Sequence, residues 1–248
     1  MTVLLEVVDL TVEFGGLRAV DGLSITVDDH ALMGLIGPNG AGKTTTIDAL
    51  CGFVRSKGKI LLAGRPIENL PPYQRARAGM VRTFQSIELF EDLTVAENLV
   101  VASTVPRWWS PFLDAIVPRR GVRGIDTEFA LDVVGLRPLA GARPSELSHG
   151  QRRLAGVARA IAARPKLVLF DEPAAGLDPS ETADLGQVLR RLPELGIGVL
   201  LVDHDMSLVL DVCDQLTVVD FGRVIASGAP EAVRDDPTVI TAYLGGTA

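Results

Sequence analysis

Cysteine is scarce in this 248-residue chain, which contains only Cys51 and Cys213. Both lie in apolar stretches typical of helices, so we expect two reduced core residues of a cytoplasmic protein and no disulfide framework. Long apolar runs are missing as well, since none approaches the roughly 18 residues that a membrane-spanning helix requires. The N-terminal residues have no positively charged region and meet Glu6 at once, so they do not resemble a signal peptide. These absences favour a soluble protein, or one that attaches to a membrane through a partner.

An excess of positive charge is also lacking. The chain has 24 Lys and Arg residues against 31 Asp and Glu residues, which gives a formal net charge of −7. No basic stripe stands out, and this argues against a nucleic-acid partner. What the chain does have is 47% hydrophobic residues, enough for a full core. Its length fits one large α/β domain or a domain with a substantial insertion.

The most informative feature is a glycine-rich loop between a predicted strand and a predicted helix. Residues 37–44 read GPNGAGKT, which fits the pattern G-x-x-x-x-G-K-T, and they lie between the apolar run 31–36 and the helical pattern 45–50. Glycines let successive N–H groups point at one phosphate cluster, and the helix N-terminus adds its positive end. The chain has only four lysines, so a lysine at this position argues against coincidence. We therefore predict a nucleoside triphosphate site.

Individual roles follow from the chemistry of this loop. Lys43 can reach the terminal phosphates, and the Thr44 hydroxyl can ligate the Mg²⁺ that accompanies them. The segment contributes the largest set of predicted nucleotide-binding residues, namely Gly37, Pro38, Asn39, Gly40, Ala41, Gly42, Lys43, Thr44 and Thr45.

Strand patterns occur at both ends of the chain. Residues 3–14 and 23–27 predict an antiparallel hairpin, and residues 58–62 predict a further strand. Later strands are separated by helix-like stretches, as parallel βαβ units require, and are predicted at 167–170, 198–202 and 216–219.

The middle of the chain is predominantly helical in pattern, with predicted helices at 93–101, 126–134 and 150–162. An irregular, proline-containing segment at 106–124 interrupts the α/β alternation and indicates an inserted or projecting region. It contains Trp108, Trp109 and Phe112, which we interpret as a partner contact or as ordinary packing of the insertion.

Two carboxylates end the apolar strand at 167–170. A buried parallel strand delivers Asp171 to its C-terminal edge, where it can hold the Mg²⁺ that bridges the phosphates. Glu172 follows directly and is placed to polarise a water for attack on the γ-phosphate. An acidic turn alone would be unremarkable, but together with the upstream glycine-rich loop it predicts triphosphate hydrolysis.

A second anion-binding helix start lies upstream, in residues 147–153 (LSHGQRR). Ser148 followed by Gly150 at the start of a helix provides a second phosphate contact, although the same pattern is also an ordinary helix N-cap. Its position about twenty residues before the acidic strand favours the phosphate interpretation.

The motifs taken in order resemble the ATP-binding subunit of an ATP-binding-cassette (ABC) transporter over essentially the whole chain. They are the loop GPNGAGKTT, a glutamine in Thr83-Phe84-Gln85, the signature LSHGQ, the strand LVLFDEP, the loop 174–178 and the histidine of Val202-Asp203-His204-Asp205. The match to branched-chain amino-acid transport ATPases extends to FGGLRAV at 14–20, to VRTFQ at 81–85, to His204-Asp205-Met206 and to the C-terminal residues 236–245. His149 departs from the usual LSGGQ signature, but Ser148 and Gly150 are retained.

The resemblance implies roles for further residues. Gln85 corresponds to the glutamine that reaches Mg²⁺ and the attacking water, so the implied metal ligands are Thr44, Gln85 and Asp171. His204 corresponds to the histidine that contacts the γ-phosphate, which makes Glu172, His204 and Gln85 the implied catalytic residues. Each has a structural alternative, since Gln85 could be a surface residue and His204 a helix cap.

Other implied residues contact the nucleotide from other directions. Phe14 occupies the position of an aromatic residue that stacks on adenine, or it is a core residue at a strand end. Ser148, Gly150, Gln151 and Asp178 are implied to contact the nucleotide of an opposing subunit, and Asp178 is alternatively a helix N-cap before Pro179.

We therefore expect an α/β phosphate-loop ATPase with a mixed central sheet and an antiparallel N-terminal β layer. Residues 1–85 and 161–248 would form its core, and residues 86–160 a helical subdomain with the signature. The resemblance implies a head-to-tail dimer of two copies, or of this chain with a related ATPase subunit, that binds ATP and Mg²⁺. It would be bound to separate permease subunits on the inner face of the plasma membrane. A solute-binding protein would complete the complex. The cargo would be branched-chain amino acids or related small amides.

Other activities remain possible at this point. They are transport of a different solute, export, a phosphate-loop kinase, and a soluble cassette protein of DNA repair or translation. A kinase would require an arginine-rich lid, and soluble cassettes usually carry two cassettes or a long coiled-coil insertion.

Overall fold

The computed structural model describes residues 2–83, 89–103 and 120–244, and it divides into two compact units. One unit comprises residues 1–85 and 166–248, and the other comprises residues 86–165. The expected boundary between residues 160 and 161 falls inside helix α6 (His149–Ala162). All strands of the described residues belong to the first unit, and the second unit is helical.

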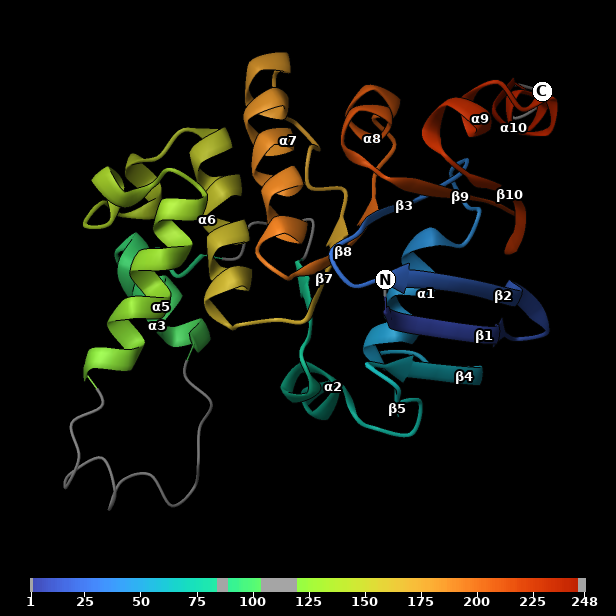
Figure 1. Cartoon of the computed structure of the whole chain (residues 1–248), viewed down its shortest axis with the longest axis horizontal. Helices are drawn as coiled ribbons and strands as arrows, with labels where there is room; N and C mark the ends of the chain where they lie inside the picture. Colours follow the sequence, from blue (N-terminus) through green and yellow to red (C-terminus); the bar gives the residue numbers. More distant parts are fainter. Residues whose placement is uncertain (1, 84–88, 104–119, 245–248) are drawn as a thin grey trace. The chain divides into compact units, whose positions relative to one another are not determined.

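A six-stranded mixed sheet forms the centre of the first unit (Figure 1). Five strands are parallel and β10 is antiparallel to β9, in the order β10-β9-β3-β8-β7-β6. Every residue of β3, β7 and β8 is buried, as expected for parallel strands covered on both faces. The bounds are β3 (Leu32–Ile36), β6 (Met80–Thr83), β7 (Leu167–Asp171), β8 (Gly198–Val202), β9 (Gln215–Asp220) and β10 (Arg223–Gly228).

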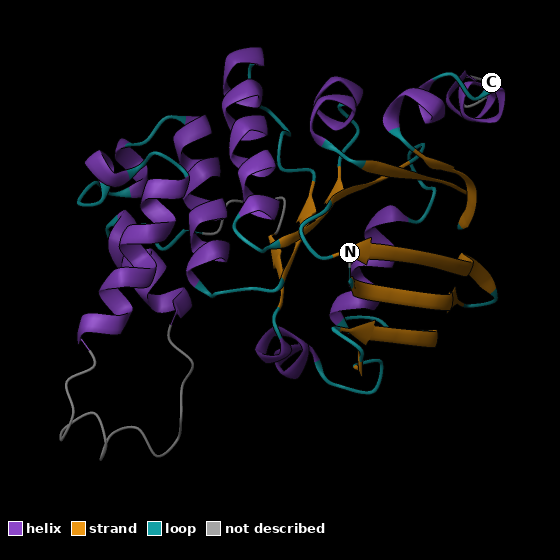
Figure 2. Cartoon of the chain, viewed as in Figure 1, coloured by secondary structure: helices purple, strands orange, loops and turns teal. Residues whose placement is uncertain are grey.

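A four-stranded antiparallel sheet faces it, in the order β2-β1-β4-β5. The predicted hairpin is present, but its second strand begins at Leu17 and not at Leu23, because β2 stays paired with β1 up to the Gly15-Gly16 turn. Figure 2 shows both sheets, and the expected antiparallel layer beside a mixed sheet is confirmed. The bounds are β1 (Val3–Phe14), β2 (Leu17–Asp28), β4 (Lys57–Leu62) and β5 (Arg65–Pro66).

Helix α1 (Lys43–Cys51) contacts strands of both sheets, so the main hydrophobic core of this unit lies around it. Helix α7 packs on β3 and β8, and α8 packs on α7. No helix in residues 2–83, 89–103 and 120–244 has the length and hydrophobicity of a membrane span. The remaining helices of this unit are α2 (Pro72–Ala78), α7 (Pro179–Glu194), α8 (Met206–Val212), α9 (Pro230–Arg234) and α10 (Pro237–Leu244).

In the second unit, helices α3 (Val95–Ser103), α5 (Arg120–Val133) and α6 pack against one another. Short 3₁₀ turns, η1 (Arg137–Leu139) and η2 (Pro144–Glu146), connect α5 to α6. The expectation that residues 106–124 are irregular is wrong at its end, because α5 begins at Arg120. The prolines that suggested a loop all lie before Arg120, and the glycines at 121 and 124 lower the stability of a helix without forbidding it. Trp108, Trp109 and Phe112 lie outside the described residues.

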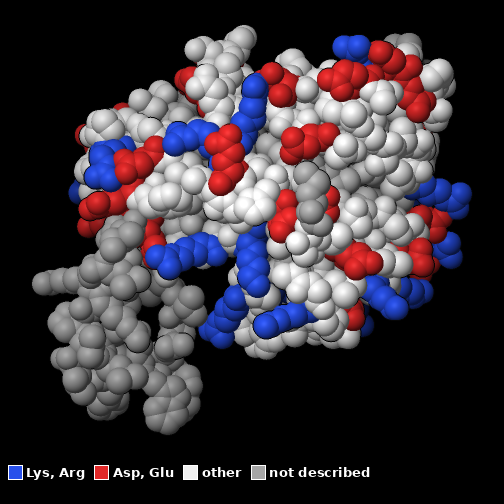
Figure 3. Space-filling view, viewed as in Figure 1, with Lys and Arg blue, Asp and Glu red and all other residues white. Residues whose placement is uncertain are grey.

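Acidic and basic side chains are interspersed on the face of the molecule that Figure 3 shows. Several form ion pairs at the surface, such as Arg18 with Glu13 and Arg223 with Asp21. Pairs this exposed contribute little to the free energy of unfolding.

One buried cation stabilises the end of α1. The Arg75 side chain comes from α2 and is almost fully buried. Its guanidinium donates to the carbonyls of Ala49 and Leu50 at 2.7 Å each, at the end of α1, where the Ala49 carbonyl also accepts the Gly52 N–H. It also donates to the Glu68 and Leu70 carbonyls at 2.6 and 2.8 Å. Arg75 therefore joins α1 to the segment that leads into α2.

We predict that Arg75→Met lowers the free energy of unfolding by at least about 2 kcal/mol, because two buried and two partly buried carbonyls lose a charged donor. Arg77→Met is the matched control, since Arg77 lies on the same helix but is exposed over the Tyr73 ring. The control should change stability by less than about 0.5 kcal/mol. Urea denaturation of both variants measures the difference, and equal effects would contradict the role of Arg75.

Candidate functional site

The glycine-rich loop joins β3 to α1 and is packed tightly against neighbouring backbone. A Cβ on Gly42, which is the N-cap of α1 and has a φ of 100°, would lie 2.3 Å from the Ala19 carbonyl oxygen. A Cβ on Gly37 would lie 2.0 Å from the Val219 carbonyl oxygen. Both contacts are far inside van der Waals distance, so only glycine fits at these two positions.

Lys43 is folded back onto this loop. Its Nζ donates to the carbonyls of Gly37 at 2.7 Å and Pro38 at 2.9 Å, and the residue is only 7% exposed. Burial lowers the pKa of the Lys43 ammonium, against the opposing influence of Glu172 and Asp171. The ammonium is thus held inside the loop by two neutral acceptors, which phosphate oxygens can replace with stronger charge-assisted bonds.

The register of the parallel strands brings the predicted acidic residues to the same edge as the loop. Strand β8 lies between β3 and β7, and Asp171 at the end of β7 pairs with Val202 at the end of β8. The C-terminal ends of β3, β7 and β8 therefore adjoin, which is where ligands bind in open α/β sheets. The Asp171 side chain is 1% exposed and that of Glu172 is 24% exposed.

Glu172 has an unusual backbone conformation. Its φ is 49°, and its N–H donates to the Val202 carbonyl at 2.7 Å. A left-handed conformation is uncommon for a residue with a side chain and is typical of functional turns. This turn leaves the Glu172 side chain partly exposed directly after a buried strand, so its carboxylate is accessible to water.

His204 follows β8, and its Nδ1 lies 3.8 Å from Glu172 Oε2 and 3.7 Å from Asp203 Oδ1. Both distances are too long for hydrogen bonds, so the ring is near the carboxylates without being bound by them. The structure therefore brings Lys43, Asp171, Glu172 and His204 to one edge of the sheet.

Asp203 was not predicted as a site residue, but it orders this edge. Its fully buried carboxylate accepts the N–H groups of His204 at 2.7 Å and Asp205 at 3.0 Å through Oδ1. Its Oδ2 accepts the Ala174 N–H at 3.2 Å. Asp203 thus joins the loop after β8, which carries His204, to the loop after β7. A carboxylate directly after an apolar strand was the available signal in the sequence.

Arg82 on β6 was also missed. Its Nη2 donates to Asp171 Oδ2 at 2.8 Å, and its Nη1 donates to Asp48 on α1. Burial would lower the pKa of this guanidinium, but the hydrogen bonds to Asp48 and Asp171 raise it overall. The partners are 34 and 89 residues away in the sequence, so no local pattern indicates them.

Two further predicted residues lie at element ends. Phe14 ends β1 and is half exposed, a position open to stacking with a planar ring. Asp178 is the N-cap of α7 and accepts the N–H groups of Ser180 at 2.8 Å and Glu181 at 2.9 Å. Asp178 therefore acts as a helix cap in this structure, as the structural alternative expected. Gln85 lies outside the described residues.

The signature residues belong to the second unit. Ser148 is the N-cap of α6, where its Oγ accepts the Gln151 N–H at 3.2 Å and Gln151 Oε1 accepts the Ser148 N–H at 2.9 Å. Ser148 and His149 are exposed, and Gly150 is buried. The helix of 14 residues therefore presents its N-terminal end at the surface with Ser148 beside it.

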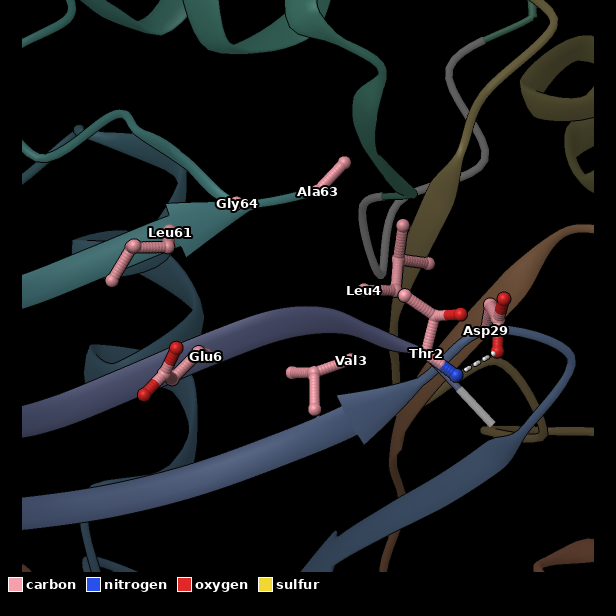
Figure 4. A pocket seen from close by; sticks show the side chains of 8 residues that line it. All are labelled: Thr2, Val3, Leu4, Glu6, Asp29, Leu61, Ala63 and Gly64. Atoms are coloured by element: carbon pink, nitrogen blue, oxygen red, sulfur yellow. Dashed lines mark hydrogen bonds between the residues drawn. The ribbon is translucent and has the colours of Figure 1, made fainter.

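Figure 4 shows a pocket of about 420 Å³ elsewhere in the first unit. Its lining is largely aliphatic, from Val3, Leu4 and Leu61, and its charged groups are the carboxylates of Glu6 and Asp29. Asp29 Oδ1 accepts the Thr2 N–H at 2.8 Å. A polyphosphate would be repelled by these acids, so the pocket is not a phosphate site.

A strand, a glycine loop and a helix beside an acidic strand end define a phosphate-loop nucleotide hydrolase. A family model described as "ABC transporter" matches residues 20–175, and one described as "Branched-chain amino acid ATP-binding cassette transporter" matches residues 223–248. The chain belongs to the ABC transporter family, and it is an ATP-binding, ATP-hydrolysing transporter subunit. The resemblance and the fold class expected from the sequence are confirmed.

Relatives with this domain match nearly the whole chain. The high-affinity branched-chain amino acid transport ATP-binding protein BraF of Pseudomonas aeruginosa is 41% identical over 98% of each chain. LivG of Escherichia coli, of the same description, is 39% identical over 98% of each. The lipopolysaccharide export system ATP-binding protein LptB of Haemophilus influenzae is 38% identical over 92% of this chain and 91% of its own.

A solved structure agrees with the fold. The crystal structure of an ATP-binding cassette of an ABC transporter in its ADP conformation has a TM-score of 0.87 and 31% sequence identity. The match covers 99% of this chain and 100% of that one.

We predict that Asp203→Asn slows ATP hydrolysis roughly 10- to 100-fold, because the amide NH₂ cannot accept the Ala174 N–H and the loop with His204 is then no longer held to the loop after β7. Affinity for ATP should stay nearly unchanged, since the glycine loop is intact. Asp205→Asn is the matched control, because asparagine replaces aspartate well at a helix N-cap. Steady-state hydrolysis and ATP titration separate the two effects. A normal rate in Asp203→Asn would remove Asp203 from the site.

Proposed function

We propose that this chain is the ATPase subunit of an importer for branched-chain amino acids or related small amides. The observation that carries the proposal is the 41% identity to BraF over 98% of both chains, together with the C-terminal match at residues 223–248. Separate permease subunits and a solute-binding protein would complete the transporter at the inner face of the membrane. A second candidate is lipopolysaccharide export, favoured by the 38% identity to LptB.

In this proposal ATP binds along the glycine loop. Backbone N–H groups of residues 39–45 and the Lys43 ammonium would contact the phosphates, and Phe14 would stack on the adenine. The phosphate contacts would replace the two carbonyls that Lys43 now uses.

The residues at this edge fit Mg²⁺, which prefers oxygen ligands. Asp171 Oδ1 is buried and, among the described residues, has no hydrogen-bond partner, so an acceptor is free for a cation. Thr44 is exposed at the start of α1 and offers a hydroxyl. Asp171, Thr44 and Gln85 would hold the ion, which when bound neutralises charge on the phosphates.

Hydrolysis would then depend on Glu172 and His204. Glu172 would orient a water and accept its proton as the water attacks the γ-phosphate, with Gln85 as a second contact to the water. His204 would donate a hydrogen bond to the γ-phosphate from its place beside Glu172. The Glu172 carboxylate suits this role because it is accessible, whereas that of Asp171 is buried.

The proposed active form is a head-to-tail dimer with two composite sites. Lys43, Asp171, Glu172 and His204 would come from one chain, and Ser148, Gly150, Gln151 and Asp178 from the other. The unit at 86–165 would be the helical subdomain that faces the permease. Closure of the dimer would switch the permease between its two open states, and hydrolysis would reverse it.

Mixing two inactive variants tests the composite site. Lys43→Ala should weaken ATP binding at least about tenfold, because a charge-assisted contact is lost. Ser148→Arg should keep ATP binding but prevent dimerisation and hydrolysis, because a bulky cation blocks the partner's site. In a mixed dimer one site carries both lesions and the other carries neither, so mixing should restore activity above the sum of the two variants.

Absence of recovery at every mixing ratio, with both variants folded and exchanging subunits, would contradict the shared site. A kinase would keep its phosphate contacts within one chain, so Ser148→Arg alone would leave it active.

A cellular experiment tests the cargo. Deleting the gene should abolish high-affinity uptake of labelled leucine, isoleucine and valine. The wild-type gene should restore uptake, and Glu172→Gln should not, because that variant binds ATP without hydrolysing it. Normal uptake in the deletion strain, with lipopolysaccharide retained in the inner membrane, would instead support the export candidate.

A further inference from the structure

Arg82 connects the two elements that carry the proposed metal ligands. It lies on β6, and its side chain is only 9% exposed. One edge of its guanidinium donates to Asp171 at the end of β7, and another donates to Asp48 on α1. The guanidinium carbon also lies 5.9 Å from the centre of the Phe53 ring. Such a planar group with contacts on several sides has little freedom to move.

The contact distinguishes the two oxygens of Asp171. Oδ2 accepts from Arg82 at 2.8 Å, whereas Oδ1 is buried without a hydrogen-bond partner in the described part of the chain. A carboxylate that is bound through one oxygen is fixed in orientation and keeps the other oxygen for a ligand. Arg82 therefore selects the oxygen that remains available.

The same contact sets where Asp171 lies relative to α1. Asp48 is four residues after Thr44, about one turn along the same helix. Because one guanidinium binds both Asp48 and Asp171, it fixes β7 against the helix that presents the Thr44 hydroxyl. It also balances charge, since two carboxylates and one guanidinium leave a single negative charge to attract a cation.

We infer that Arg82 is a positioning residue for the Mg²⁺ of the nucleotide site. It holds Asp171 by Oδ2 so that Oδ1 ligates the ion, and it holds Asp171 in register with Thr44. The inference rests on the proposed function, in which Asp171 and Thr44 are metal ligands. Arg82 itself contacts neither the ion nor the nucleotide.

The experiment compares binding of a fluorescent ATP analogue with Mg²⁺ and with EDTA. Wild-type protein should bind more tightly with Mg²⁺. Arg82→Met should bind the analogue like wild type in EDTA. Its affinity for Mg²⁺ should fall about 10- to 100-fold, the usual cost of removing a residue that orients a metal ligand, so Mg²⁺ should tighten binding of the analogue less than in wild type. Arg190→Met is the matched control, because it removes another arginine–aspartate pair, with Asp211, on the helices α7 and α8. The control should behave like wild type.

Arg82→Lys supplies the same test if Arg82→Met does not fold. Lysine keeps the charge, but one ammonium does not reproduce the fork that reaches both carboxylates, so part of the Mg²⁺ effect should be lost. An undiminished Mg²⁺ effect in the folded variant overturns the inference and leaves the proposed function standing. Weaker binding in EDTA and in Mg²⁺ alike overturns it too, because the role is then structural. No Mg²⁺ effect in wild type would refute the metal site itself.

Discussion

The close approach of backbone to backbone around the glycine loop is the constraint on which the rest of the site depends. The loop runs so near the carbonyls of Ala19 and Val219 that no side chain fits at Gly42 or Gly37. The Gly222 N–H in turn donates to the Ala41 carbonyl at 3.0 Å. Strands from both sheets therefore hold the loop in one shape. A loop whose shape is fixed by the surrounding fold loses less entropy when it binds phosphate.

Two of the reactive groups are held by residues to which the sequence assigned no role. Asp171 is held by Arg82, and the loop with His204 is held by Asp203. Arg75 fixes the far end of the helix that begins with Lys43. These supporting side chains are buried and charged, which is costly unless every one of their bonds is made. Their burial therefore favours a single arrangement of the site.

The sequence predicted the parallel strands and the glycine loop well, because continuous apolar runs and a fixed motif are local signals. It did not predict the first part of β2, because residues 17–22 include polar residues and a glycine. These residues form a strand because they pair with β1. It did not indicate Arg82, whose partners are distant in the sequence. Ser148 and Asp178 show a different limit, because serine and aspartate before a helix are suited both to capping and to phosphate contact.

The interruption of the first unit by residues 86–165 has a consequence for the order of folding. Strands β1, β2 and β4 pair with near neighbours in the sequence, so this sheet and α1 can assemble early during synthesis. Strand β3 pairs with β8 and β9, which emerge more than 160 residues later. Contacts between such distant segments form slowly. Strand β3, which leads into the glycine loop, is thus one of the first strands to be synthesised and one of the last to be paired. Until it pairs, its apolar surface requires protection from other chains.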